Sequence, residues 1–185
     1  MIKKGIALIL TITILIMPMQ VQAKTIYRYT TPAKVSLKTN TRSTGKTAYR
    51  VKTNTKLAVT KQYKVWAQVK YNGKTLYVKK KWLSSRRSPR KYTAAQMKRS
   101  GVIRWGGCKW TYYTQRILPG RGLNIPGRHL DKEGFVCDRD GYIVVAMTRQ
   151  DRINHTVVPT PFGKFGKCYD CGGGGSAWRD LYTNW

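Results

Sequence analysis

Two aspartates near the C-terminus, Asp170 and Asp180, flank a glycine run in a chain that is otherwise nearly devoid of acidic residues. Cleaving a glycosidic bond requires a carboxylic acid that is still protonated when it meets the leaving oxygen, and most glycosidases pair that acid with a second carboxylate. Burial, or the negative charge of Asp170, would have to raise the pKa of Asp180 for it to keep its proton. The two aspartates are therefore candidate catalytic residues. In a simpler interpretation, both only accept hydrogen bonds from neighbouring loops.

The glycine run at 172–175 has no Lys-Ser or Lys-Thr behind it and opens no helical pattern, which argues against a phosphate-binding loop. It is either a flexible turn or a place where a bulky chain approaches closely. Aromatic side chains near the aspartates are candidates for stacking on sugar rings, or else belong to the core and rim of a small barrel. They are Trp105, Trp110, Tyr112, Tyr113 and Trp178.

The four cysteines, Cys108, Cys137, Cys168 and Cys171, predict two disulfides if the protein is exported, and three pairings are open. A zinc site that adds histidines is an alternative, but these cysteines lack the paired spacing of zinc ligands, so we expect no metal. The Tyr-Asp-Cys-Gly sequence at 169–172 is also similar to the nucleophile motif of NlpC-type papain-like endopeptidases. In that family a histidine follows well downstream, and no histidine follows Cys171 here.

The charge is strongly asymmetric along the chain. The formal net charge is +29, from 36 Lys and Arg against 7 Asp and Glu. Residues 24–130 carry 27 basic side chains and no acidic ones, whereas 131–185 carry seven of each. A field of this size attracts polyanions and says little about the fold.

Residues 1–23 have the pattern of a secretory signal peptide: an early lysine pair, an apolar run, and a Val-Gln-Ala cleavage site. An uncleaved anchor is the alternative, but the run is shorter than the roughly 20 apolar residues that span a bilayer. We expect a secreted or wall-associated protein without a transmembrane segment after cleavage. Export favours the phosphate-rich polymers of a bacterial wall, or a membrane surface, over a specific nucleic acid.

A charged, proline-containing stretch at 85–91 predicts a linker between two small domains. Before it, apolar and polar residues alternate as in half-buried strands, and Asn72-Gly73 predicts a hairpin turn. After it, residues 93–99 predict a short helix with Thr93 as N-cap and Gly101 as its stop. The remainder predicts strands and loops, so the whole chain is expected to be all-β.

Residues 28–84 resemble a bacterial SH3-like domain. The resemblance rests on Val-Ser-Leu-Lys at 35–38, on Trp-Ala-Gln-Val-Lys-Tyr-Asn-Gly-Lys-Thr-Leu-Tyr-Val at 66–78, and on Lys-Trp-Leu-Ser at 81–84. Leu76 stands where glycine is usual. Such domains target secreted enzymes to the cell wall, and Lys79, Lys80 and Lys81 would suit an anionic wall polymer. Otherwise these lysines form an ordinary solvated surface.

About residues 135–185 resemble the three-aspartate (3D) domain, a double-psi β-barrel shared with the lytic transglycosylase A family, and we expect the whole domain to span 92–185. Four segments carry the resemblance, and they occur in the order Gly-Tyr-Ile-Val-Val-Ala, Val-Val-Pro-Thr-Pro-Phe-Gly, Lys-Cys-Tyr-Asp-Cys-Gly and Arg-Asp-Leu-Tyr. The family's second and third aspartates fall on Asp170 and Asp180, and the third acts as the catalytic acid. The first is absent, because Met147 and Thr148 follow Val145-Ala146.

The resemblances imply a secreted two-domain protein of the cell wall that cleaves peptidoglycan glycan strands without hydrolysis. One acid is enough for a transglycosylase, because the 6-hydroxyl of muramic acid attacks and forms an anhydro ring. A non-catalytic wall-binding protein of the same fold is the first alternative. An exported cationic protein that binds anionic surfaces is the second. We expect a monomer with no cofactor.

Overall fold

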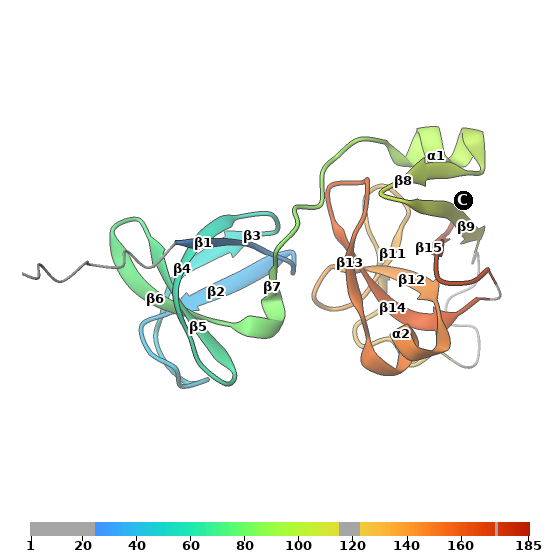
Figure 1. Ribbon diagram of the computed structural model, residues 1–185. Helices are drawn as coiled ribbons and strands as arrows, with labels where there is room; N and C mark the ends of the chain where they lie inside the picture. Colours follow the sequence, from blue (N-terminus) through green and yellow to red (C-terminus); the bar gives the residue numbers. More distant parts are fainter. Residues whose placement is uncertain (1–24, 115–122, 173) are drawn as a thin grey trace, which may run out of the picture.

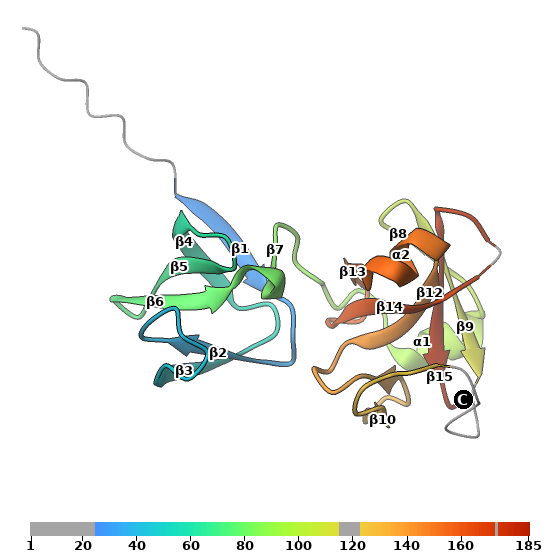
Figure 2. The same cartoon turned by 90° about the horizontal axis from the view of Figure 1, so that it is seen from below.

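The computed structural model describes residues 25–114, 123–172 and 174–185. These residues form two β-sheets, one from each half of the chain, which confirms the prediction of an all-β protein. Figures 1 and 2 show the two sheets side by side, joined by a single extended connection. The predicted signal peptide at 1–23 lies outside the described residues. Within the described ranges, no helix is both long enough and apolar enough to cross a membrane.

The N-terminal sheet has seven strands in the order β3-β2-β6-β5-β4-β1-β7. Every strand predicted before residue 84 is present, and all paired neighbours run antiparallel. The strands are β1 (Ile26–Thr30), β2 (Lys34–Lys38), β3 (Thr47–Lys52), β4 (Lys56–Gln62), β5 (Trp66–Tyr71), β6 (Lys74–Lys79) and β7 (Leu83–Ser84), with the 3-10 turn η1 (Lys80–Trp82) before the last.

The alternation in these strands places every second side chain in one core. Leu37, Leu57, Val69 and Val78 are fully buried there. Burying each such side chain stabilises the fold by about 1.5–3 kcal/mol relative to leaving it exposed. The predicted hairpin is confirmed between β5 and β6, where Asn72 and Gly73 both adopt positive φ, at 47° and 72°.

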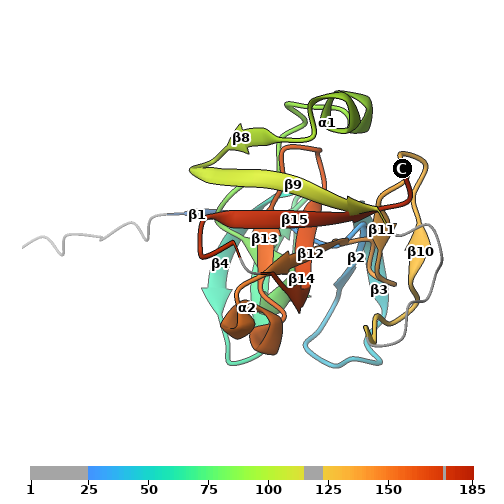
Figure 3. The ribbon, with the colours of Figure 1, turned by 90° about the vertical axis from the view of Figure 1, so that its right-hand side faces the viewer.

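The C-terminal sheet runs in the order β10-β11-β12-β15-β9-β8, and β14 pairs with both β12 and β13. Figure 3 shows β9 and β15 lying side by side and pointing the same way, in agreement with their parallel pairing. The strands are β8 (Ile103–Trp105), β9 (Cys108–Thr114), β10 (His129–Leu130), β11 (Val136–Cys137), β12 (Ile143–Met147), β13 (Val157–Pro159), β14 (Phe165–Cys171) and β15 (Trp178–Thr183).

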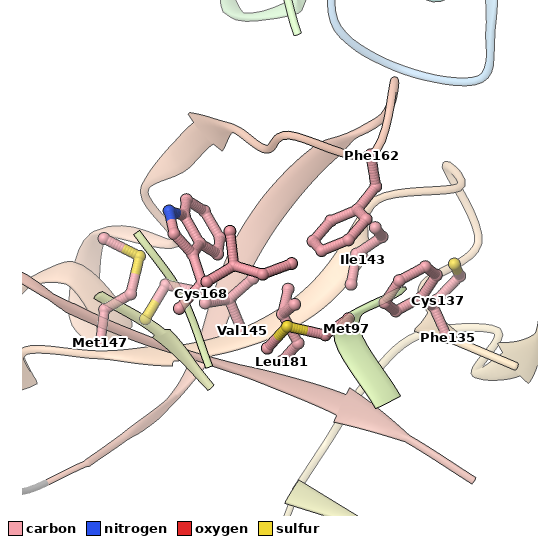
Figure 4. Close-up of a cluster of buried hydrophobic side chains, with 11 residues drawn as sticks. Met97, Phe135, Cys137, Ile143, Val145, Met147, Phe162, Cys168 and Leu181 are labelled. Atoms are coloured by element: carbon pink, nitrogen blue, oxygen red, sulfur yellow. The ribbon is translucent and has the colours of Figure 1, made fainter. Parts of the chain in front are cut away.

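Strand β12 lies at the centre of this sheet, and all five of its residues are buried. Its apolar run Ile-Val-Val-Ala-Met suits a strand that is covered on both faces. One face joins a cluster with Met97, Phe135 and Leu181, and the other joins a smaller cluster with Tyr169 and Tyr182. Figure 4 shows the first of these clusters.

Two short helices flank the C-terminal sheet. Helix α1 (Ala94–Ser100) confirms the prediction: Thr93 and Gln96 form a capping box, and Gly101 ends the helix at φ 69°. Helix α2 (Arg149–Asn154) was not predicted, because its sequence lacks an apolar period. Its start is fixed locally, since the Thr148 hydroxyl accepts a hydrogen bond from the Asp151 backbone N–H.

The connection at 85–91, predicted as a linker, is anchored to both sheets. Ser88 is 1% exposed, and its hydroxyl donates to the carbonyl of Thr160 at 2.8 Å. Asn54 binds the connection from the N-terminal side, since its amide donates to the Ser88 carbonyl and its carbonyl accepts from the Ser88 N–H. The Asn54 amide also donates to the Gly163 carbonyl at 3.0 Å. One side chain therefore ties three segments together.

A second contact joins the sheets on the other side of the connection. The hydroxyls of Thr31 and Tyr142 lie 2.6 Å apart and are buried, and the Ala33 N–H donates to the Asp140 carbonyl. Gly141 has φ 79°, and a Cβ at this position would lie 2.5 Å from that of Ala33. Only glycine therefore permits both the turn and the close approach.

Replacing Asn54 with alanine removes the tertiary hydrogen bonds at the connection and leaves polar groups of Ser88 without partners. We expect a loss of about 2 kcal/mol in the free energy of unfolding, measured by urea denaturation. Asn72→Ala is the matched control, because Asn72 also has positive φ but is exposed and makes no side-chain hydrogen bond within the described residues. Equal losses in the two variants would contradict the role assigned to Asn54.

Candidate functional site

Asp170 and Asp180 lie on either side of one small residue in the middle of the C-terminal sheet. Ala146 of β12 pairs with Asp170 of the parallel strand β14 and with Asp180 of the antiparallel strand β15. Asp180 in turn pairs with Thr111 of β9. Paired residues project to the same face of a sheet, so the four side chains form one row across four strands. We call this row the aspartate row.

The local sequence explains why the row forms. The register between β12 and β14 shifts after Val145, so that Val145 pairs with Cys168 but Ala146 pairs with Asp170. Tyr169 is the extra residue, and such a β-bulge turns the next side chain. Ala146 then leaves space between the two carboxylates that a larger apolar residue would fill.

Asp180 is half-buried, and one of its oxygens is held by a hydrogen-bond chain. The indole N–H of Trp178 donates to the Thr111 hydroxyl, which donates to Oδ1 of Asp180 at 2.7 Å. Oδ2 has no hydrogen-bond partner among the described residues, so this oxygen is free to carry a proton. Burial, and then the charge of Asp170, raise the pKa of Asp180, while the Thr111 hydrogen bond opposes them.

Asp170 has a different environment from Asp180. The Tyr182 hydroxyl donates to its Oδ2, and the Cys171 backbone N–H donates to its Oδ1 at 2.8 Å. Burial, together with the hydrogen bond to Asp170, raises the pKa of Tyr182, so this tyrosine stays a donor. Both oxygens of Asp170 therefore accept hydrogen bonds, as an ionised carboxylate prefers.

Neither aspartate of the row forms an ion pair with another described residue. The described residues contain three ion pairs, and they use Glu133, Asp131 and Asp138. A neighbouring lysine or arginine would lower the pKa of a carboxylic acid. Among the described residues, the lack of an ion pair at Asp180 therefore leaves its protonated form accessible.

A cavity of about 150 Å³ opens over Asp180. Its walls include Ala146, Met147, Trp178 and the glycines Gly172, Gly174 and Gly175. Of these glycines, Gly174 lies so close to the Trp178 ring that a Cβ there would overlap it. The glycine run therefore allows its backbone to approach the Trp178 ring closely. Gly173, within the run, lies outside the described residues.

The aromatic residues predicted to bind sugar divide between two faces. Trp178 lines the cavity, and Tyr113 pairs with Tyr182 two residues from the aspartate row, where its side chain is 53% exposed. Trp105, Trp110 and Tyr112 lie on the opposite face of β9 and its neighbour. Trp110 is buried in the core, and Tyr112 packs against Trp185 with ring centroids 4.6 Å apart. The sequence alone could not show which face each aromatic residue occupies, because strand pairing determines the face.

The two predicted disulfides are not formed, because all four cysteines are free. Cys168 and Cys171 pair with Val145 and Met147 of β12, so the bulge at Tyr169 leaves both on one face, but Cys168 is buried and Cys171 is exposed. Cys168 and Cys137 occupy opposite ends of the buried cluster in Figure 4, with Val145 and Ile143 between them. Cys108 is half-buried beside this cluster.

The zinc alternative has no support in the described part of the chain, where no three His, Cys, Asp or Glu side chains gather as a metal site would require. The ring nitrogen Nδ1 of His155 lies 3.1 Å from the Cys168 carbonyl, and that of His129 lies 3.0 Å from the Gly127 carbonyl. Each histidine is therefore bound to backbone.

The three lysines predicted to bind wall polymer lie far along the N-terminal sheet from the aspartate row. Lys79 ends β6 and places its ammonium over the rings of Trp66 and Trp82, at 5.9 and 5.4 Å. Lys80 and Lys81 are exposed in η1. The described residues provide no acidic partner for any of the three.

The chain matches no protein-family model, and comparisons with curated proteins and with solved structures found no match.

Asp180→Asn should stabilise the folded protein at neutral pH. The raised pKa means that the folded state binds more protons than the unfolded state between the ordinary aspartate pKa, about 3.9, and the folded value. Stability contributed by Asp180 therefore falls as the pH rises through that window. Urea denaturation should show the variant to be more stable than the wild type at pH 7, with the difference shrinking towards pH 3. A variant that is less stable at pH 7 would argue against a raised pKa.

The free thiols should differ sharply in reactivity. Cys171 is exposed, whereas burial raises the pKa of Cys137 to about 12 and that of Cys168 to about 11. In the native protein at pH 8, iodoacetamide should modify Cys171 at least about tenfold faster than either buried thiol. Mass spectrometry of tryptic peptides measures this, and Cys171→Ser should abolish the fast phase. An intact mass lower by four hydrogens would instead restore the two disulfides.

Proposed function

We propose that the protein is a secreted cell-wall protein that cleaves peptidoglycan glycan strands by transglycosylation, with Asp180 as the acid. The observation that carries the proposal is the aspartate row. It places a half-buried aspartate with a raised pKa beside an open cavity and beside a second carboxylate. A carboxylic acid kept protonated by its surroundings is what protonation of a glycosidic oxygen requires.

The proposed reaction needs only one carboxyl group. Oδ2 of Asp180 gives its proton to the glycosidic oxygen as the bond from that oxygen to the sugar C1 breaks. The 6-hydroxyl of the same sugar then bonds to C1 through its oxygen, and its proton returns to Asp180. The products are a free sugar hydroxyl and a 1,6-anhydro sugar, and no water is consumed. Thr111 holds Oδ1, so the proton is kept at Oδ2.

The parts of the proposal that concern fold and targeting rest on resemblance. We propose that residues 28–84 are an SH3-like targeting domain and 92–185 a double-psi barrel. The support is a seven-stranded antiparallel sheet in the first and, in the second, the parallel pairings of β12 with β14 and of β9 with β15. The acid-free surface of the first part suits attachment to anionic wall polymers.

A non-catalytic wall binder is the second candidate, and one observation favours it. The position where the three-aspartate family has its first aspartate is occupied here by Met147 and Thr148. Thr148 caps helix α2 and bonds to Asp151 instead of facing a substrate. This site therefore has one carboxylate fewer than the family pattern.

Asp180→Asn should lower the release of anhydro-muropeptides from purified walls by about 10² or more, the usual scale for a positioned general acid. Asparagine keeps the size and the acceptor for Thr111 but has no proton to transfer. Asp140→Asn is the matched control, because Asp140 is exposed and lies outside the cavity. Reverse-phase chromatography with mass spectrometry measures the products. No release by the wild type between pH 4 and 8, or equal release by a folded Asp180→Asn, would favour the non-catalytic binder.

Asp170→Asn should leave activity but move its pH optimum downward. The negative charge of Asp170 is one cause of the raised pKa of Asp180, so a neutral neighbour lets Asp180 ionise at lower pH. The rate of anhydro-muropeptide release measured over pH 4 to 8 tests this. An upward shift, or complete loss of activity in a folded variant, would contradict the role assigned to Asp170, which is to raise the pKa of Asp180 by its charge.

A further inference from the structure

A second and larger cavity lies where the two sheets and their connection meet. Its volume is about 520 Å³. Arg86 and Arg87 of the connection, Arg179 of β15, Tyr29 of β1 and Trp105 of β8 contribute to its walls. Arg179 and Asp180 are neighbours on one strand and project to opposite faces, so this junction groove is on the far side of β15 from the aspartate row.

The groove is positively charged and has no acidic residue in its walls. Arg86 and Arg87 are exposed, and neither side chain takes part in any of the three ion pairs of the described residues. The Arg179 guanidinium donates to the carbonyls of Ser176 and Trp178, at 2.6 and 2.7 Å, which fixes its position. Guanidinium groups bind phosphate and carboxylate oxygens in a planar, two-pronged geometry.

The groove also offers a flat aromatic wall held in place. Trp105 is half-buried, with its ring 6.2 Å from that of the buried Trp110, and the Trp110 indole N–H donates to the Trp105 carbonyl at 3.0 Å. An aromatic face of this kind packs against the apolar face of a ring-shaped ligand. Together, the walls suit a chain in which rings alternate with anionic groups.

The junction is built to hold the groove open before a ligand arrives. Asn54 and Ser88 fix the connection that carries Arg86 and Arg87, and Thr31 with Tyr142 fixes the sheets on the other side. Preorganised walls lower the cost of binding, because fewer groups must be ordered on association.

We propose that the junction groove binds a wall polysaccharide in which sugar rings are joined or substituted through phosphodiester groups. A phosphodiester stays ionised at the acidic pH at which a carboxylate begins to lose its charge, so it keeps its attraction to the arginines under conditions that protonate Asp180. The inference rests on the wall association in the proposed function and is independent of its catalytic part.

The test uses the full mature chain carrying Asp180→Asn, so that cleavage cannot alter the ligand. Isothermal titration measures its affinity for glucosylated poly(glycerol phosphate), with and without R86Q/R87Q. We expect the double substitution to weaken binding at least tenfold. The control is R42Q/R50Q, which removes the same charge from an exposed position of the β2–β3 loop and one of β3, both outside the groove, and should weaken binding less than twofold. Thermal denaturation checks that all variants are folded.

Three results would overturn the proposal. Equal losses in the two double variants would show that only the overall field matters. Equal affinity for polygalacturonate, in which carboxylates replace the phosphates, would show that the groove does not select phosphate groups. Tighter binding to a single-stranded DNA oligonucleotide would point to a different class of polymer. A separate assay distinguishes failure of this inference from failure of the proposed function. It measures anhydro-muropeptide release by R86Q/R87Q, in the otherwise wild-type chain, from glycan strands stripped of phosphate polymer.

Discussion

The pairing of Ala146 with Asp170 on one side and with Asp180 on the other is the constraint on which the site depends. It brings together two carboxylates that are ten residues apart in sequence, and it needs β12 to be buried between a parallel and an antiparallel neighbour. The apolar run of β12 supplies that burial, and the bulge at Tyr169 sets the register. The same burial that stabilises the sheet raises the pKa of Asp180, so stability and the proposed chemistry have a common physical cause.

Acidic and basic side chains are distributed differently along the chain, and this division matches its two proposed functions, glycan cleavage and the binding of anionic polymer. Acidic side chains occur only after residue 130, where Asp131 and Asp138 are paired with Lys164 and Lys167, and Glu133 is paired with Arg90 of the connection. Asp138 also accepts hydrogen bonds from Tyr169 and from the backbone of the turn that contacts the N-terminal sheet. These three acids therefore serve the fold and its junction. Arg86 and Arg87 of the junction groove are exposed and form none of the ion pairs of the described residues.

Much of the fold could be predicted from the sequence, for reasons that are local. Alternation of apolar residues predicted strands β2, β4, β5 and β6 of the N-terminal sheet, Asn72-Gly73 predicted a hairpin, and Thr93 with Gly101 bounded helix α1. The candidate acid could also be chosen, because so few carboxylates exist. Helix α2 was missed, since its cap at Thr148 is a weak signal without an apolar period. The anchored connection at Ser88 was missed because the bonds that bury it come from Asn54 and Thr160, distant in sequence.

The cysteines and aromatic residues show where sequence reasoning stops. An even count of cysteines in a chain expected to be exported predicted disulfides, yet all four are free: Cys171 is exposed, and the buried Cys137 and Cys168 lie at opposite ends of one cluster. Likewise, five aromatic residues looked equivalent in sequence, and the register of β9 against β15 assigned Tyr113 to the face of the aspartate row and Tyr112 to the other face. Both outcomes depend on pairing across strands, which composition and spacing do not encode.

We propose that Asp180 keeps its proton to a higher pH than an ordinary aspartate and lies beside a cavity that receives glycan. Carboxyl-carbon NMR of selectively labelled protein, titrated with and without a muropeptide tetrasaccharide, tests both points in one experiment. We expect the Asp180 carboxyl to titrate above the ordinary aspartate value of about 3.9 and its signal to shift when the tetrasaccharide is added. An Asp180 carboxyl that titrates at or below that value, with a signal unmoved by the tetrasaccharide, would contradict it.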